Sequence, residues 1–187
     1  AAVLLALQAW RSWVLLASYD QGIFQQVLWN SLQGHPFEST LSSQLSTNVI
    51  HAGELPSVDY ERLGQHFTPT LLLWAPLLGL IGGAALPLVQ VGLITAAGLT
   101  LHRLALGLLP ERTANWLTYG FFAGNALIGP TLGNYTDLCQ LPLAVFILML
   151  GLVERRRCWI TGAALWIPLI REDTGVLLVA IGLWLLL

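Results

Sequence analysis

Long runs of apolar residues alternate with short polar stretches along this chain. The runs cover residues 1–17, 86–109, 116–132, 138–153, 158–170 and 176–187. Hydrocarbon accepts only backbone that satisfies its own hydrogen bonds, so repeated apolar runs are typical of membrane helices. The pattern therefore predicts an all-α fold, a polytopic bundle of transmembrane helices in one membrane domain over residues 1–187. Both ends of the chain fall inside apolar runs, which predicts a fragment of a longer protein.

Residues 18–68 form the longest polar stretch and are predicted to be an external loop that carries interfacial helices. An amphipathic helix begins this loop, because apolar residues recur there at helical spacing. These residues are Ile23, Phe24, Val27, Leu28 and Leu32. Asp20 is a suitable N-cap, Gly34 a suitable C′ residue and Trp29 suits the headgroup level, so we expect a helix lying in the membrane interface. Residues 39–48, rich in Ser and Thr, are predicted to be a loop.

Whether residues 69–82 cross the membrane decides on which side of it the polar loop 18–68 lies. Thr68 and Pro69 favour a helix start, but the apolar segment 71–81 is shorter than the ~20 residues that a spanning helix needs. Pro76 interrupts this segment as well, so we expect a re-entrant or interfacial helix. If these residues cross the membrane instead, the polar loop lies on the other face and the site considered below is lost. This alternative stays open.

The charges are few, and their positions indicate the orientation. Only 10% of residues are charged, against about 25% in a typical soluble domain, and mean hydropathy is +0.70. All cations are Arg, and the net charge is −2, which argues against nucleic acid as a partner. The positive-inside rule puts the basic turn 155–157 in the cytoplasm and, by parity, the loop 18–68 outside. We expect a multi-pass protein of the plasma (inner) membrane, with the lipid bilayer as its main partner.

Acidic residues from distant segments fall on this external face: Asp20, Asp137, Glu172 and Asp173. A carboxylate at membrane depth costs about 2.5–3.5 kcal/mol at a helix centre, so such residues are functional candidates. Glu172 and Asp173 fit best because the run 158–170 is too short to clear the bilayer. The alternative is an ordinary helix boundary, in which Asp173 caps the following helix.

Two of these carboxylates also have an ordinary explanation. Asp20 stands just after the first apolar run, where a partly desolvated carboxylate can act as a general base on a hydroxyl. A helix N-cap would explain the same residue. Asp137 lies at a helix start, where capping is the usual role.

Arg171 and His66 are candidates for phosphate binding. A guanidinium fork suits phosphate well, although Arg171 could instead pair with Glu172. His66 lies where the loop re-enters the membrane and could donate to a phosphate, ligate a metal, or be a plain interfacial histidine. Cys139 and Cys158 have no metal-ligand spacing. The cofactor therefore stays unknown; a divalent metal is open, but no pattern requires one.

Three segments together resemble a known family, the predicted membrane proteins called domain of unknown function 2079. The segments are Tyr19-Asp-Gln-Gly-Ile-Phe24, Gly64-Gln-His-Phe-Thr-Pro69 and Arg171-Glu-Asp-Thr-Gly175. The resemblance spans nearly the whole chain. Two positions depart from the family pattern, since Arg171 stands where the family often has Lys and Asp137 where it tends to have His.

That family in turn resembles the polyprenyl-phosphate-dependent glycosyltransferases of type C. This resemblance implies a catalytic Asp in the first external loop, and Asp20 is the matching position. The resulting hypothesis is a membrane enzyme that takes sugar from a polyprenyl-phosphate donor. Its substrate-binding candidates are His66, Arg171, Glu172, Asp173 and Asp137. A transporter or flippase and a non-catalytic membrane protein remain as alternatives.

Overall fold

The computed structural model describes residues 1–14, 18–49, 60–133 and 135–186, and these confirm the predicted all-α class. The α-helices are α1 (Ala2–Trp13), α2 (Tyr19–Leu32), α3 (Thr40–Val49), α4 (Ala75–Ile81), α5 (Ala85–Leu106), α6 (Glu111–Ala123), α7 (Asn125–Gly133), α8 (Leu141–Val153), α9 (Arg157–Ile170) and α10 (Gly175–Leu186). Short 3-10 turns join them: η1 (Arg62–Gly64), η2 (Pro69–Trp74), η3 (Gly82–Ala84), η4 (Asp137–Gln140) and η5 (Glu172–Thr174). Within the described residues, the one β contact is an isolated bridge between Glu38 and Glu61.

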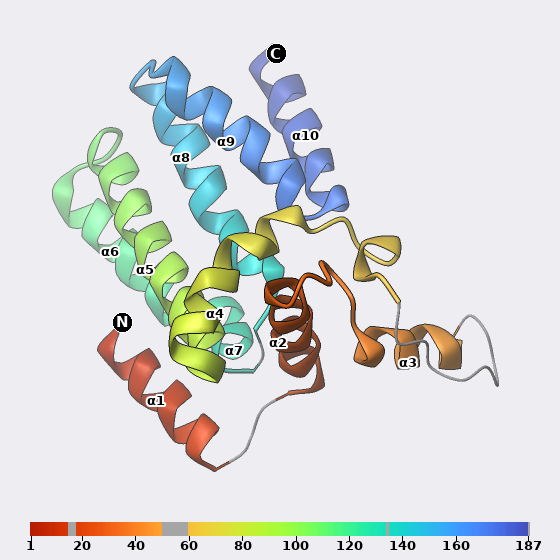
Figure 1. Ribbon diagram of the computed structural model, residues 1–187. Coiled ribbons are helices and arrows are strands. Elements are labelled where there is room, and N and C mark those ends of the chain that lie inside the picture. The colour runs from red at the N-terminus through yellow and green to blue at the C-terminus, as the bar shows by residue number, and fades with distance from the viewer. Residues whose placement is uncertain (15–17, 50–59, 134, 187) are drawn as a thin grey trace.

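Helices α5, α8 and α9 lie side by side and form the centre of the molecule (Figure 1). Helices α8 and α9 approach each other closely at Gly151, where an added Cβ would lie 3.1 Å from the backbone nitrogen of Ile160. A small residue at a helix crossing allows this close approach, as is common in membrane bundles. The centre therefore combines α8 and α9, which follow each other in the chain, with α5, which is separated from α8 by α6 and α7.

Helix α2 packs into the core. Its apolar face is buried, with Ile23, Phe24, Val27 and Leu28 each at most 5% exposed, and it contacts α4. The predicted helix and its C′ residue are confirmed, since Gly34 has φ of +90°. The N-cap is Ser18 rather than Asp20, because the Ser18 hydroxyl accepts a hydrogen bond from the backbone N–H of Gln21 at 3.3 Å. Asp20 instead lies in the first turn of the helix.

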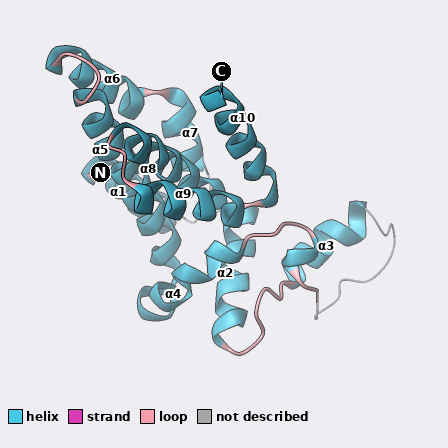
Figure 2. Ribbon diagram, turned by 90° about the horizontal axis from the view of Figure 1, so that it is seen from above, coloured by secondary structure: helices cyan, strands magenta, loops and turns pink. Residues whose placement is uncertain are grey.

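The prediction of a loop over residues 39–48 is wrong, because α3 occupies most of that segment. Ser39 explains the difference, since its hydroxyl accepts a hydrogen bond from the N–H of Ser42 at 3.1 Å and so caps the helix. Serine and threonine favour caps as well as loops, and composition alone does not separate the two. Helix α3 lies well apart from α5, α8 and α9 when the molecule is seen from above (Figure 2).

Among the described residues, one helical stretch is long and apolar enough to cross a membrane, Pro69–Leu106. Two shorter apolar helices follow it, Asp137–Val153 and Arg157–Ile170. The long stretch is not straight: the chain turns at Gly82, which has φ of +61°, and α4 and α5 run in opposite directions along the page in Figure 1. Helix α5 has 22 residues, enough by itself for a span of about 20 residues.

The apolar run 116–132 does not form one helix. It is divided at Gly124, which has extended backbone and separates α6 from α7. A strand-like residue breaks the helical hydrogen-bond pattern, so neither α6 nor α7 reaches the length of a span. The shared apolar character of these helices was visible in the sequence, whereas the break was not.

Candidate functional site

A small, mainly polar cavity of about 220 Å³ lies where four distant segments of the chain meet. Its lining residues are Asp20, Ile23, Phe24, Arg62, Gln65, His66, Tyr135, Thr136, Asp137 and Arg171. We call this space the polar cavity. It brings together four of the predicted site residues, namely Asp20, His66, Asp137 and Arg171. Glu172 and Asp173 do not line it, but each contacts a residue that does.

Asp20 reaches the polar cavity from the first turn of α2. The buried face of this helix, with Ile23 and Phe24, fixes its position against the core. Asp20 is an exposed residue that also lines the cavity, and the partial desolvation of its carboxylate stays a prediction. A carboxylate in this lining can approach a molecule bound in the cavity.

Arg62 is a cavity residue that the sequence-based prediction missed. It is only 7% exposed, and its guanidinium carbon lies 4.6 Å from the centre of the Phe24 ring. Its Nη1 donates a hydrogen bond to Gln65 at 3.4 Å, while its Nε has no hydrogen-bond partner. Burial lowers the pKa of this guanidinium, and the carboxylates of Asp137 and Asp20 oppose that shift.

A signal for Arg62 was present in the sequence. It is the only Lys or Arg in the polar stretch 18–68, which the positive-inside rule predicts to lie outside. The positive-inside rule makes a lone external arginine unusual, and an unusual charge is a functional candidate. The buried guanidinium with an unused N–H donor is suited to an anionic ligand.

Asp137 provides the most buried carboxylate of the polar cavity, with 2% exposure. Its Oδ1 accepts hydrogen bonds from the N–H of Leu138 at 2.9 Å and from the hydroxyl of Thr136 at 3.2 Å. The Nη1 of Arg171 lies 4.0 Å from the same oxygen. The other oxygen, Oδ2, is buried without a hydrogen-bond partner. The N-cap of η4 is Thr136 rather than Asp137, which occupies the first turn and keeps one acceptor for the cavity.

Arg171 is held by Asp173 through a two-point contact. Its Nε and Nη2 donate to the two carboxylate oxygens of Asp173 at 2.8 and 2.6 Å. These bonds raise the pKa of Arg171 and lower the pKa of Asp173. Arg171 therefore pairs with Asp173, and the alternative in which it pairs with Glu172 is wrong. The contact fixes the plane of the guanidinium beside Asp137.

Glu172 joins the start of η5 to the loop before η2. Its Oε1 lies 2.9 Å from Nδ1 of His66, and its Oε2 accepts the N–H of Phe67 at 2.8 Å. Partial burial acts to raise the pKa of Glu172, but the hydrogen bonds from His66 and the backbone outweigh it, so the pKa lies below its ordinary value. Glu172 therefore positions His66 at the edge of the polar cavity.

The described residues contain no group of three or more His, Cys, Asp or Glu side chains that could hold a metal ion. The chemistry that these residues offer is ionic. Two guanidinium groups, Arg62 and Arg171, lie near two carboxylates, Asp20 and Asp137. Such a site can bind an anion and accept a proton from a hydroxyl.

Comparison with known families gives one match, which covers residues 11–187. The family is described as "Predicted membrane protein (DUF2079)", and the chain belongs to it. This confirms the family that the sequence motifs indicated, and it supports a lipid bilayer as the environment of the protein. No curated protein and no solved structure matches the chain. The likeness to type C glycosyltransferases stays a prediction.

Proposed function

We propose that this member of the predicted membrane protein family is a multi-pass enzyme of the plasma (inner) membrane. It would transfer a sugar from a polyprenyl-phosphate donor to an acceptor hydroxyl at the external face. One observation carries the proposal: Asp20, Arg62, Asp137 and Arg171, from four separate segments, line one polar cavity at the end of apolar helices. A general base and a phosphate-binding pair are what this transfer needs.

The placement in the membrane is supported by the distribution of charge along α5, α8 and α9. Arg103 pairs with Glu154 at one end of these helices, and Arg171 lies at the other end of α9. Between the ends the outer surfaces are apolar, with Leu99 and Leu165 both 63% exposed. A large exposed apolar surface of this kind suits lipid rather than water. The polar cavity then lies at one membrane face, as the proposal requires.

In the proposed reaction the acceptor oxygen forms a bond to the anomeric carbon of the sugar, and the bond from that carbon to the phosphate oxygen breaks. Asp20 accepts the proton of the acceptor hydroxyl. The electron pair of the broken bond stays on the departing polyprenyl phosphate. Arg171 and Arg62 stabilise the charge that develops there, because guanidinium groups in a partly buried site act strongly on phosphate.

The other residues would position these groups. Asp173 orients Arg171 through its two-point contact, and Glu172 orients His66. His66 then offers its second ring nitrogen to a substrate oxygen. Asp137, with its free Oδ2, suits a sugar hydroxyl as donor, since a buried acceptor without a partner gains most from one.

The test is the Asp20→Asn variant in membrane vesicles that contain the full-length protein. The donors are undecaprenyl-phosphate glucose, mannose and galactose with a radiolabelled sugar, and the signal is label that leaves the lipid fraction. Loss of a general base lowers such rates by roughly 10² to 10⁴-fold. Donor binding should stay within about twofold, and Glu111→Gln, an exposed carboxylate in α6, should leave both unchanged.

Two results would contradict the proposal in different ways. Full transfer by Asp20→Asn would remove this residue from catalysis. Failure of the wild-type protein to bind any of the three donors would reject a polyprenyl-phosphate substrate of this class. Donor binding without transfer by the wild type would instead favour a non-catalytic member of the family.

A further inference from the structure

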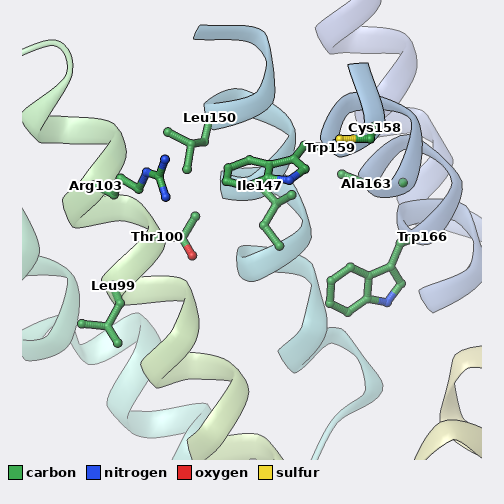
Figure 3. A pocket seen from close by; sticks show the side chains of 10 residues that line it. Leu99, Thr100, Arg103, Ile147, Leu150, Cys158, Trp159, Ala163 and Trp166 are labelled. Carbon is green, nitrogen blue, oxygen red and sulfur yellow. The ribbon is translucent and has the colours of Figure 1, made fainter. Parts of the chain in front are cut away.

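A second hollow, larger and mainly apolar, runs between α5, α8 and α9, with a volume of about 680 Å³. Leu99, Thr100 and Arg103 come from α5, Ile147 and Leu150 from α8, and Cys158, Trp159, Gly162, Ala163 and Trp166 from α9. We call it the apolar groove. Figure 3 shows Arg103 and Trp159 towards one end of it and Trp166 towards the other. Its volume falls in the range of about 300–1,000 Å³ that is usual for ligand sites.

We infer that the apolar groove binds an anionic phospholipid, with an acyl chain along the groove and the phosphate at Arg103 and Arg156. The inference rests on the membrane location of the family and not on sugar transfer. It concerns the end of the helices opposite to the polar cavity. The two proposals can therefore fail separately.

The charged end of the apolar groove is built for an anion. The Cζ atoms of Arg103 and Arg156 lie 5.3 and 4.8 Å from the centre of the Trp159 ring, one cation–π contact each. Both side chains are about half exposed, at 55% and 52%. They share one carboxylate, Glu154, at 2.7 and 2.8 Å. Two accessible guanidinium groups on one partner leave room for a second anion.

The sequence around this end adds charge of the same sign. Arg155 and Arg157 flank Arg156, so the turn between α8 and α9 carries three consecutive arginines and one glutamate. Basic pockets between membrane helices bind anionic headgroups on the cytoplasmic side, where anionic lipids are enriched. The positive-inside rule assigns this turn to that side. Charge complementarity therefore favours an anionic lipid over a zwitterionic one.

The walls of the apolar groove suit an acyl chain rather than a polar ligand. Leu99 and Ile147 provide aliphatic surface, and Leu99 is 63% exposed in the absence of any occupant. Gly162 leaves open space, since an added Cβ at this position would meet no atom within 4 Å. An acyl chain can fill such a space by dispersion contacts alone.

The chain contains its own reporter, because Cys158 lines the apolar groove and is exposed, whereas Cys139 is buried. The full-length protein in detergent micelles is mixed with dioleoyl-phosphatidylglycerol or dioleoyl-phosphatidylcholine. The rate of Cys158 modification by N-ethylmaleimide is then measured by peptide mass spectrometry. We expect the anionic lipid to slow modification about fivefold or more relative to the zwitterionic lipid, since each arginine near the headgroup contributes about fivefold in affinity.

Variants test the contributions of the acyl chain and of the headgroup separately. Native mass spectrometry measures the affinity for phosphatidylglycerol. Gly162→Leu fills the apolar groove and should abolish retention of the lipid. Gly182→Leu in α10, where an added Cβ also meets nothing, is the matched control and should retain it. Arg103→Gln should weaken binding about fivefold. Glu154→Gln should strengthen it, because the competing carboxylate is gone.

Three results would overturn the inference. Equal protection by both lipids would mean that the arginines do not select the headgroup. Protection by neither would leave the apolar groove without a lipid. Protection that rises with protein concentration and needs no lipid would show that a second copy of the chain covers it.

Discussion

The polar cavity, which includes Arg171 directly after helix α9, and the apolar groove, which is lined by α9 itself, are built in different ways. The polar cavity is small and gathers side chains from segments more than a hundred residues apart, such as Asp20 and Arg171. The apolar groove is about three times larger and is lined by three helices that contact their neighbours directly. The polar cavity thus depends on contacts between loops and helix starts far apart in the chain, whereas the apolar groove depends on the packing of whole helices against one another. A substitution in the polar cavity should therefore leave the apolar groove unchanged, and the reverse, unless the substituted residue links the two regions.

Gln140 is such a link between the two regions. Its amide donates to the hydroxyl of Thr70 at 3.0 Å and to the carbonyl of Asp137 at 3.3 Å. Its oxygen accepts from the indole N–H of Trp166, which lines the apolar groove, at 3.2 Å. The side chain is fully buried. One amide therefore joins the segment of the polar cavity to the wall of the apolar groove.

The largest effect is expected from Arg171→Gln, which should weaken binding in the polar cavity and leave the apolar groove unchanged. Loss of a charge-assisted contact to phosphate weakens binding by roughly 10- to 100-fold. The measurement is the affinity for undecaprenyl-phosphate glucose by native mass spectrometry. Arg112→Gln, an exposed arginine of α6, is the control and should bind as the wild type does. Unchanged binding by Arg171→Gln would mean that the phosphate lies elsewhere.

A smaller effect, on stability and on both regions together, is expected from Gln140→Leu. The change leaves the partly buried Trp166 N–H and the Thr70 hydroxyl without this partner, at a cost of about 1–3 kcal/mol. Thermal unfolding in detergent should show a lower midpoint. Trp166→Phe, which removes one of these bonds and keeps a ring, should cost less. If Gln140→Leu unfolds at the wild-type temperature, the two regions are not joined through this amide.

The smallest effect is expected on the pH dependence of stability, through Glu172 at the edge of the polar cavity. The pKa of Glu172 is lowered in the folded protein, so its contribution to stability is fully present above the ordinary value of about 4.5 and is lost as pH falls through the lower, folded value. The carboxylate is 48% exposed, which limits the contribution to less than about 1 kcal/mol. Unfolding midpoints of wild type and Glu172→Gln should therefore differ at pH 6 and converge towards pH 3.5. A constant difference over that range would contradict the assignment.

The sequence predicted the helical class, the family and four of the residues that line the polar cavity, namely Asp20, His66, Asp137 and Arg171. Counting the apolar runs as membrane crossings predicted that Asp20, Asp137 and Arg171 lie at one face. In the structure these three residues line the same polar cavity. The membrane crossings on which this parity was counted stay predictions, since one helical stretch among the described residues is long and apolar enough for a span. The roles of these residues in catalysis remain predictions.

The details that could not be predicted depend on competition between neighbours. Ser18 and Asp20 are both good caps, and only the geometry of the first turn shows that Ser18 serves. Asp173 and Glu172 are equally placed in sequence to pair with Arg171, and the backbone of η5 decides for Asp173. Arg62 was overlooked because its burial arises from Phe24, which is 38 positions away in the chain.

The backbone at Gly82 has a consequence for how deeply the chain can enter a bilayer. A straight helix over the 38 residues Pro69–Leu106 would be about 57 Å long, almost twice the ~30 Å of the hydrocarbon layer. Gly82 has φ of +61°, a conformation that residues with a Cβ rarely adopt, and the helical segment reverses its direction there. One glycine thereby divides an oversized segment into the short helix α4 and the returning helix α5, whose 22 residues match the thickness of the hydrocarbon layer.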